Sequence, residues 1–576
     1  MCGGALAAIL VAIVGRDYPL VGHDLRYYIP RLLDTDIHLR LNGPAVQWYT
    51  PSFGGGLPAF ANPQHLQYSA LQAFTYFVDP WVSFQLTTAA ITLLGFLVFH
   101  RFLRTRLKLH LLTSVLGAVF LIGNGFYIEH LIVGHVGFQL FPLVAVMLFA
   151  LTCPNRRVIV CASLIALCVA AMMFQAGVYL IILLGLSLAV SLPVLYLVKP
   201  DVVDLRRLTS IAAVALGLSL AMVGSRIYAT LAFMRQFPRE VADIYDVGLA
   251  QALVGFAAQL IGLMPLAPIF ALMGADVTLL STALLKLTGA SVQVGVWELD
   301  TGLSPVLTAC LCLGLLGGIA KVRGGTLPRL DRGQIAALIM VLVMSWIFVE
   351  ATLARGFVYP VVKGLPVLRS LHVNHRIAAV FILPLTIVGV AILDRWYVRT
   401  QRSRVVATML CAALVAPLSF WLLPARVHLK SFDVTQSVAD AQRIRSGDPL
   451  IVTRIADVED AEALSLGASS YRPYEPMFGY GLATFAAETR LGDVRAMSSG
   501  YFNMTNPASL VFPALNQVRP FERIPVEDRD NLDRFVARGQ PAWHVPATQH
   551  RLNWLACLAL TFTVGVLLAA LVKLAR

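Results

Sequence analysis

Charged residues are scarce in this sequence of 576 residues: Asp, Glu, Lys and Arg together make up 13%, whereas hydrophobic residues make up 58%. Soluble domains carry about 25% charged residues, and the mean hydropathy here is +0.73. This composition excludes a water-soluble enzyme, a disordered chain, a coiled coil and a collagen. Apolar runs close to the ~20 residues that cross a bilayer recur along the chain, which indicates a polytopic membrane protein.

Several signatures of soluble chemistry are also missing. The sequence has no GxxxxGK[ST] phosphate-binding loop and no Rossmann fingerprint, so we expect neither a nucleotide-driven motor nor a soluble nucleotide-sugar domain. Its eight cysteines lie in or beside apolar runs and form no CxxC pair. This pattern predicts neither a disulfide framework nor a cysteine metal site.

The excess of positive charge is confined to short segments. The chain carries 45 Lys and Arg against 32 Asp and Glu, a net charge of +13. Nineteen of the bases and only four of the acids fall in six segments, and the remaining 26 bases and 28 acids nearly balance. Cytoplasmic loops of membrane proteins are enriched in Lys and Arg, so the charge predicts topology and not binding to DNA or RNA. The segments are 101–110, 154–157, 199–208, 321–332, 393–404 and the C-terminal tail.

Twelve apolar runs are expected to cross the membrane. The first, Cys2 to Val14, is short, but it has no basic flank and no A-x-A cleavage site, so we expect a transmembrane helix and not a signal peptide. The stretch 247–289 is apolar but interrupted by Pro, Gly and Asp. It is either a hairpin of two further spans, giving 14, or a re-entrant or interfacial segment. The other eleven runs are 81–100, 111–128, 136–152, 158–174, 177–198, 209–234, 303–320, 334–353, 377–393, 404–424 and 553–572.

With both termini in the cytoplasm, every basic segment falls inside. Two large segments, 15–80 and 425–552, then fall outside. The second contains alternating runs bounded by Gly, Asp and Pro, which predicts a small α/β domain. We therefore expect an all-α polytopic membrane protein with a transmembrane module over 1–424, an extracytoplasmic α/β domain over 425–552, and a final helix with a cytoplasmic tail over 553–576.

The first outer segment carries two distinctive motifs. Residues 21–30 read VGHDLRYYIP, and residues 48–64 read WYTPSFGGGLPAFANPQ. The combination of G-x-D-L-x-x-Y-x-P with W-x-x-P-x-x-G-G-G-x-P-x-x-A-N-P-Q resembles the YfhO-like branch of the GT-C glycosyltransferases. Two later segments resemble that family in the expected order: GHVGFQLFP at 134–142 and LPVLRSLHVNHR at 365–376.

The resemblance implies a GT-C-like fold and a membrane-embedded transferase. Such an enzyme takes a sugar from a polyprenyl-phosphate carrier on the outer face of the bacterial cytoplasmic membrane. Its partners would be the lipid-linked donor, a glycan, lipid or protein acceptor, and the bilayer itself. No cofactor is expected.

The chemistry of such a transfer needs a carboxylate, because the proton of the attacking hydroxyl must be accepted. Asp24 lies in the first motif, about ten residues after the first span, and is therefore expected at the outer membrane interface as the general base. The alternatives for Asp24 are a helix cap or a partner for Arg26. Glu129 and Glu298 are two further interfacial carboxylates, of which Glu298 is the second catalytic candidate.

Cations are needed to hold the departing phosphate. Arg226 interrupts an apolar run, and a charge at that depth is functional by default, although an arginine can also snorkel to the interface. Arg369 and Arg376 flank the outer end of the span at 377 and are either phosphate ligands or ordinary interfacial charges.

Other polar and aromatic residues are candidates for contact with the sugar or the acceptor. His130 and His135 lie in a short loop with Glu129, where a metal ion is possible but hydrogen bonding to sugar is favoured. In the last outer segment, aromatic faces around Tyr474 and Glu475 are suited to stacking on sugars, or else form a packed loop. The complete set of substrate-binding candidates is Arg226, Arg369, Arg376, His135, Glu129, Tyr28, Asn62, Tyr474 and Glu475.

Two other function classes compete with the transferase. A transporter or flippase of a lipid-linked saccharide predicts pseudo-symmetric halves and ionisable residues at mid-depth, whereas the sequence shows no repeat and its polar residues gather at the outer interface. A scaffold that has kept the fold and lost activity is the third reading. The sequence favours the transferase but does not identify the sugar, the acceptor or the polyprenol.

Overall fold

The structure is a computed structural model of the 576-residue chain. It describes residues 1–154, 156–237, 247–274, 276–289, 295–322, 332–354, 356, 359–364, 373–447, 450–475, 488–539 and 542–575. All structural statements below concern these residues.

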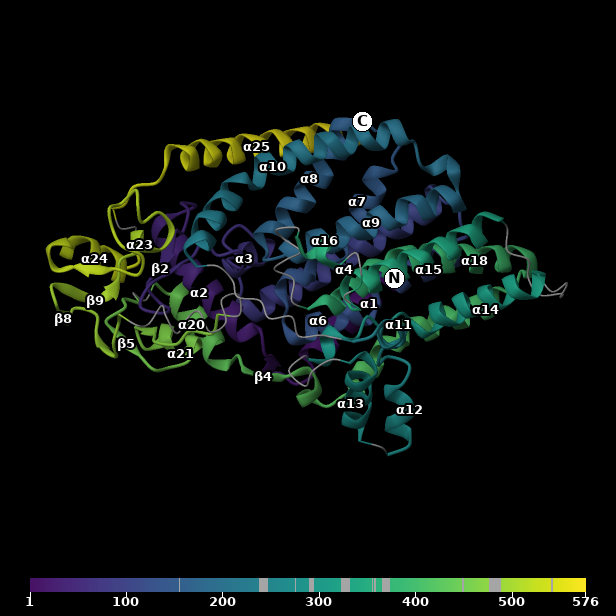
Figure 1. Ribbon diagram of the computed structural model, residues 1–576, viewed down its shortest axis with the longest axis horizontal. Coiled ribbons are helices and arrows are strands. Elements are labelled where there is room, and N and C mark those ends of the chain that lie inside the picture. Colours follow the sequence, from purple (N-terminus) through teal and green to yellow (C-terminus); the bar gives the residue numbers. More distant parts are fainter. Residues whose placement is uncertain are drawn as a thin grey trace.

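Each of the twelve predicted apolar runs contains a helix. In Figure 1 the long helices run roughly along the horizontal axis, and most of the labelled strands lie toward the left end. The helices in the apolar runs are α1 (Cys2–Gly15), α4 (Pro80–Thr105), α5 (Leu111–Ile122), α6 (Gly125–Val133), α7 (Leu143–Leu151), α8 (Val158–Phe174), α9 (Val178–Val198), α10 (Leu205–Gln236), α14 (Pro305–Val322), α15 (Arg332–Thr352), α18 (Ile382–Thr400), α19 (Ser403–Val415) and α25 (Ala547–Ala575).

Within the described ranges, seven helices are long and apolar enough to cross a membrane, or up to eight if α5 and α6 form one span. This confirms a multi-pass membrane protein, whereas the count of 12 or 14 spans stays a prediction. The run at 111–128 departs from a simple span because α5 ends at Gly123, the Asn124 side chain caps α6, and the two helices meet at 42°. The run at 136–152 opens as the 3₁₀ helix η1 (Val136–Leu140) and continues as α7 after Pro142.

The stretch 247–289 folds as three short helices, α11 (Leu249–Ile261), α12 (Ala267–Leu272) and α13 (Val277–Thr288). At 1.5 Å per residue, a helix of 12 or 13 residues is about 20 Å long, which is less than the ~30 Å of a hydrocarbon core. These helices are therefore too short for two full spans and favour the re-entrant or interfacial alternative.

The basic segments meet at one end of the bundle. The Arg207 side chain donates to the carbonyl of Cys153 at 2.7 Å, and the Arg106 guanidinium lies 3.2 Å from the Cys153 sulfur. His110 lies 3.4 Å from the Asp394 carboxylate. Together with the bond that Arg207 donates to the carbonyl of Arg156, these contacts join four of the six basic segments, which is the arrangement expected if the segments share one side of the membrane.

This arrangement leads to a test of topology. We expect reporter fusions at Asp201, between α9 and α10, and at Gly492, in the last outer segment, to give opposite cytoplasmic and extracytoplasmic signals. Both residues are exposed in loops or at a strand edge, so a fusion there leaves the core intact. Signals of the same kind at both sites would contradict the proposed orientation.

The described parts of the two large segments that are predicted to lie outside, 15–80 and 425–552, form one body at the opposite end (Figure 1). Strand β1 pairs antiparallel with β4, β5 pairs parallel with β6 and antiparallel with β7, and β9 lies between β8 and β10. The elements are β1 (Leu20–Gly22), α2 (Leu25–Asn42), β2 (Tyr49–Thr50), β3 (Leu57–Pro58) and α3 (Ala70–Thr75) in the first segment, with η6 (Ala425–His428), β4 (Lys430–Asp433), α20 (Thr435–Arg445), β5 (Arg454–Ala456), α21 (Asp460–Ser465), β6 (Ala468–Ser470), β7 (Gly492–Asp493), β8 (Met497–Ser498), β9 (Tyr501–Thr505), α23 (Ala508–Val511), β10 (Arg523–Pro525), η8 (Val526–Asp528) and α24 (Arg529–Val536) in the last.

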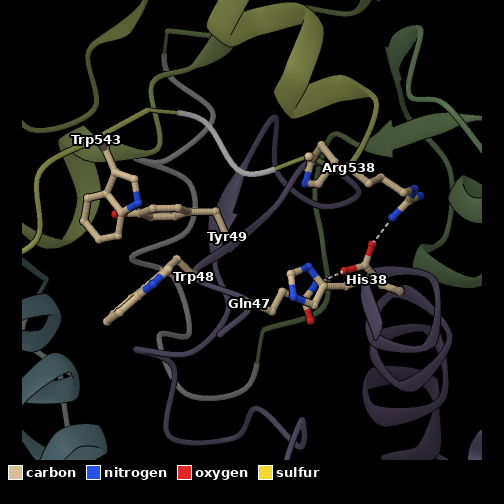
Figure 2. Close-up of a pocket in the computed structure, with 9 residues that line it drawn as sticks. His38, Gln47, Trp48, Tyr49, Arg538 and Trp543 are labelled. Atoms are coloured by element: carbon tan, nitrogen blue, oxygen red, sulfur yellow. Dashed lines mark hydrogen bonds and ion pairs between the residues drawn. The ribbon is translucent and has the colours of Figure 1, made fainter. Parts of the chain in front are cut away.

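The two segments share a hydrophobic core. Phe53 and Phe60 of the first segment pack in one cluster with Ile455 and Phe535 of the last. At the rim of this core, Trp48 and Tyr49 pack edge-on against Trp543, with ring centroids 5.2 and 5.0 Å apart (Figure 2). The segment 425–552 thus combines helices and strands as expected, but its core is continuous with the first loop, and its status as a separate domain stays a prediction.

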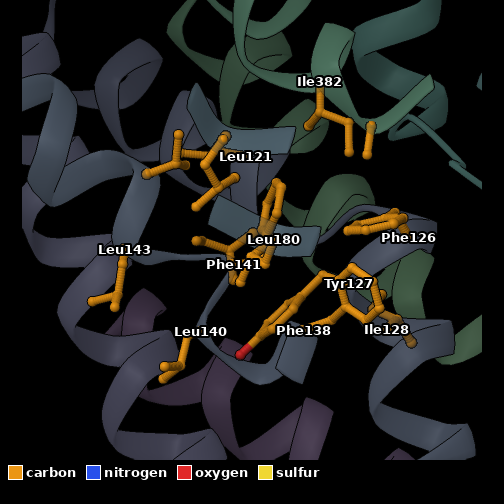
Figure 3. Close-up of a cluster of buried hydrophobic side chains, with 14 of the residues drawn as sticks. Leu121, Phe126, Tyr127, Ile128, Phe138, Leu140, Phe141, Leu143, Leu180 and Ile382 are labelled. Carbon is orange, nitrogen blue, oxygen red and sulfur yellow. The ribbon is translucent and has the colours of Figure 1, made fainter. Parts of the chain in front are cut away.

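An aromatic cluster lies where α6 meets η1. Phe126 and Tyr127 of α6 pack with Phe138 of η1 and with Phe141 (Figure 3), and the Phe126 ring lies 5.3 Å from Phe138 and 5.7 Å from Phe141. Burial of rings of this size contributes strongly to packing. The cluster therefore fixes the turn between α6 and η1, where the candidate site lies.

The remaining described elements are short and connect the helices. They are η2 (Pro200–Val202), η3 (Val296–Glu298), α16 (Tyr359–Gly364), η4 (Asn374–Phe381) and η5 (Ala416–Leu422).

Candidate active site

Two glycines bring Asp24 to the end of α6. The backbone at Gly22 passes so close to α6 that a Cβ there would lie 2.2 Å from the carbonyl oxygen of Ile132. Gly134 ends α6 with a φ of +90°, a left-handed conformation that favours glycine. Asp24, two residues after the first glycine, therefore lies beside His135, the residue after the second, which explains the glycines of both motifs.

The Asp24 carboxylate is not used to cap a helix or to pair with its neighbour. Asp24 occupies the N-cap of α2, but its side chain accepts no capping hydrogen bond. The neighbouring Arg26 pairs instead with Glu459, at 2.6 Å. Both structural alternatives for Asp24 are thus disfavoured by the geometry.

Two residues hold the Asp24 side chain: His135, the N-cap residue of η1, and Tyr474 of the last outer segment. Its Oδ2 lies 2.7 Å from Nε2 of His135, and its Oδ1 accepts a hydrogen bond of 3.3 Å from the Tyr474 hydroxyl. Burial alone would raise the pKa of the Asp24 carboxyl, but the interaction with His135 lowers it below its ordinary value of 3.8. The side chain remains 19% exposed, so the carboxylate is partly accessible, and its lowered pKa favours the ionised form.

A second carboxylate, Glu298 of η3, lies in the same region. The Arg376 side chain donates to both Glu298 oxygens, with Nε 2.6 Å from Oε2. Burial would raise the pKa of Glu298, but the Arg376 charge holds it well below its ordinary value. The Glu298 Oε2 also lies 3.6 Å from Nε2 of His130.

Two neighbouring histidines connect Asp24 with Glu298: His135 contacts Asp24, and His130 lies near Glu298. The His130 and His135 rings have centroids 4.9 Å apart, and the Phe138 ring lies 4.4 Å from His130. The Arg376 guanidinium lies over the Phe138 ring, 5.0 Å from its centroid. The structure thus brings together Asp24, His135, Glu298, Arg376 and Tyr474 of the candidate residues.

Asn62 and Glu475 form a neighbouring buried network. The Asn62 amide donates to Glu475 Oε1 at 3.2 Å and to the Tyr27 hydroxyl at 3.1 Å. Arg31 pairs with Glu475 at 3.2 Å and with Asp460 at 3.0 Å. The network joins α2, the first loop and the last outer segment. It therefore positions the loop that carries Tyr474.

Stability should depend on pH through Glu475. Burial raises the pKa of its carboxyl above the ordinary 4.5, against the opposing charge of Arg31 and with the like charge of Asp460. The folded state therefore binds the proton more tightly than the unfolded state, and this stabilisation is lost as pH rises from about 4.5 through the raised pKa. We expect Glu475→Gln to show a shallower fall of the unfolding midpoint over that range. Identical pH profiles for the variant and the wild type would contradict this assignment.

Arg226 lies fully buried in α10. Its Nη2 donates to the carbonyls of Asn62 and His65 at 2.8 and 2.6 Å, and its guanidinium lies between the rings of Phe60 and Phe174. It therefore does not snorkel but anchors the first loop to the bundle. Its Nε and Nη1 are buried without a hydrogen-bond partner among the described residues, so its role as a phosphate ligand stays a prediction.

The other candidates lie as follows. Glu129, on α6, pairs with His428 at 2.6 Å and not with Asp24. The Tyr28 hydroxyl accepts a hydrogen bond of 3.3 Å from Gln64. Arg369 lies outside the described residues.

Sequence reasoning missed the residues that join distant segments. Arg31, Asp460 and His428 complete buried ion pairs, and Arg538 of the last segment pairs with Asp34 of α2 (Figure 2). The only local signal was their charge, which does not identify a partner. Their partners lie hundreds of residues away, so spacing along the chain could not identify them.

Comparison with known proteins gives one structural similarity. No family model matches the sequence, and no curated protein matches it. Among solved structures, the cryo-EM structure of the arabinofuranosyltransferase AftD from Mycobacteria is similar at a TM-score of 0.41 and 16% sequence identity. The similarity covers 73% of this chain and 27% of that chain, so this chain spans about a quarter of its neighbour's length.

Proposed function

We propose that the protein is a membrane glycosyltransferase of the GT-C type that moves a sugar from a polyprenyl-phosphate carrier to an acceptor on the outer face of the cytoplasmic membrane. The observation that carries this proposal is the Asp24 carboxylate. It lies in a motif that resembles the YfhO-like branch, has a lowered pKa, is held by His135 and Tyr474, and remains partly exposed. A helix cap or an ion pair with Arg26 would not leave the carboxylate in this state.

The transfer follows from these positions. The acceptor hydroxyl loses its proton to Asp24 while its oxygen forms a bond to the anomeric carbon of the sugar. The bond between that carbon and the phosphate oxygen breaks, and the electron pair leaves with the polyprenyl phosphate. Since the phosphate is a good leaving group, the protein needs a base and positioning more than an acid. His135 orients the base, and Tyr474 fixes its second oxygen.

Phosphate binding is assigned to arginines at the outer ends of the helices. Arg376 carries a planar fork that is paired with Glu298, and Arg226 keeps Nε and Nη1 without a hydrogen-bond partner among the described residues. Guanidinium groups bind phosphate oxygens bidentately. Arg369 belongs to the same segment of sequence as Arg376 and is the third proposed ligand.

The transferase reading is tested by product formation. The purified full-length protein, in liposomes of bacterial lipid, is incubated with synthetic polyprenyl-phosphate pentoses and hexoses and a panel of glycan and lipid acceptors. We expect at least one donor to be converted to free polyprenyl phosphate with transfer of its sugar. If the protein instead moves an intact donor across the bilayer with its sugar attached, it is a flippase of lipid-linked saccharides and the transferase proposal is wrong.

A further inference from the structure

His130 is prepared to bind a cation through one ring nitrogen. It is 1% exposed, and its Nδ1 lies 2.8 Å from the carbonyl oxygen of Phe126. A carbonyl only accepts hydrogen bonds, so Nδ1 carries the proton and Nε2 presents a lone pair. This Nε2 is buried and has no hydrogen-bond partner within the described ranges. It faces Glu298 Oε2 at 3.6 Å, and two acceptors face one another favourably only when a positive charge lies between them.

His135 shows the same division of its two nitrogens. Its Nε2 lies 2.7 Å from the Asp24 carboxylate. Because a carboxylate accepts hydrogen bonds, Nε2 carries the proton and donates a hydrogen bond to Asp24. Its Nδ1 is buried and finds no hydrogen-bond partner in the described part of the chain. Histidines that bind metals usually donate one N–H to a carboxylate or a backbone carbonyl and use the other nitrogen as the ligand. His130 donates its N–H to a backbone carbonyl, and His135 donates its N–H to a carboxylate.

Glu298 supplies the third donor. One ligand atom from each of His130, His135 and Glu298 lies within 4.8 Å of the other two. A carboxylate has about four acceptor positions, and Arg376 occupies one on each oxygen, so both oxygens keep a free position. Asp24 and Glu298 together outweigh the one positive charge of Arg376, which leaves the site with a net negative charge when the imidazoles are neutral.

We propose that His130, His135 and Glu298 bind one divalent metal ion of the zinc class. Two imidazole nitrogens and one carboxylate oxygen suit Zn²⁺ or a similar transition metal, whereas Mg²⁺ and Ca²⁺ prefer oxygen ligands. At Zn–N distances of about 2.0–2.1 Å, tetrahedral ligand atoms lie roughly 3.3 Å apart, so small side-chain rotations close the site. Asp24 orients His135 from outside the ligand set.

The sequence alone favoured hydrogen bonding to sugar for these histidines, because only a loop spacing of five connected them. Glu298 follows them by more than 160 positions and becomes a third ligand only through the fold. A site of three protein ligands leaves a coordination position for water or for an oxygen of substrate, as in catalytic metal sites. The inference concerns metal binding and does not depend on the proposed transfer reaction.

The test uses the metal alone. The full-length protein is purified in detergent, treated with a chelator, and titrated with Co²⁺ while the visible absorption of cobalt is followed, with Zn²⁺ then added as competitor. We expect one ion per chain, an absorption typical of a site with nitrogen and oxygen ligands and fewer than six donors, and loss of the signal when Zn²⁺ displaces it. Zn²⁺ should also raise the unfolding midpoint of the wild type, because a ligand that binds only the folded state stabilises it.

Three variants decide which residues are ligands. His130→Ala and His135→Ala should each weaken Co²⁺ binding by at least about tenfold, while His544→Ala, at an exposed position of the last outer segment, should bind as the wild type does. If His130→Ala fails to fold, His135→Ala and the Zn²⁺-dependent stability of the wild type still decide the matter. Absence of Co²⁺ binding by the folded wild type, or equal binding by all three variants, would overturn the proposal.

Discussion

Replacing Asp24 by Asn is expected to lower sugar transfer by a factor of roughly 10²–10⁴, the contribution of a positioned general base. The amide keeps the shape of the carboxylate but does not accept the proton of the attacking hydroxyl. Its oxygen can still accept the Tyr474 hydrogen bond, so the fold should be preserved. The measurement is the turnover of polyprenyl-phosphate sugar by the purified variant, with its unfolding midpoint as a check on folding.

Asp457→Asn is the matched control for this substitution. Asp457 is an exposed carboxylate of the same outer body, and we expect its loss to leave turnover unchanged. Near-normal turnover by Asp24→Asn would move the catalytic role to Glu298, the second carboxylate of the site. A similar loss in both variants would indicate a general effect of surface charge and not a general base.

Substitution of Arg226 should show whether this arginine only anchors the first loop. Arg226→Ala removes two hydrogen bonds from a charged group to buried carbonyls, each with a net contribution of about 1.5–3 kcal/mol. We therefore expect a loss of stability of about 3 kcal/mol or more, seen as a lower unfolding midpoint in detergent. Arg226→Lys should lose less stability, because an ammonium can still bond one carbonyl.

Donor binding separates the two roles of Arg226. If the free Nε and Nη1 hold the donor phosphate, Arg226→Lys should weaken binding of polyprenyl phosphate even where the variant remains folded, because lysine lacks the guanidinium fork. The control is Arg206→Ala, an exposed arginine on the same helix. Unchanged donor binding in Arg226→Lys would restrict Arg226 to a structural role, and the same pair of substitutions at Arg376 and Arg369 would then locate the phosphate.

Much of the membrane architecture could be predicted from the sequence, because it depends on local composition. Apolar runs form helices wherever they occur, and basic loops collect on one side of the bilayer. The breaks were harder to predict. Gly123 and Asn124 divide one run into α5 and α6 because the asparagine side chain caps the new helix. Hydropathy averaged over a window of residues does not detect such a capping side chain.

The site was predictable only where the motifs carry geometric constraints. Asp24 and His135 meet because Gly22 and Gly134 allow the chain to pass closely and turn, and both glycines stand in the motifs. The pairing of Glu298 with Arg376 and the contact of Asp24 with Tyr474 join segments that are 78 and 450 residues apart. Such pairs depend on tertiary packing and leave no periodic signal in the sequence. The catalytic and binding roles of these residues remain predictions.

The most direct test of the account is a density map of the full-length protein with polyprenyl phosphate bound. We expect the phosphate to lie at the predicted outer end of the helices, held by at least one of Arg226, Arg369 and Arg376, with the Asp24 carboxylate facing the position that the sugar would occupy. A phosphate bound at the opposite end, among the basic loops near Asp394, or at the outer end but out of reach of Asp24, would contradict it.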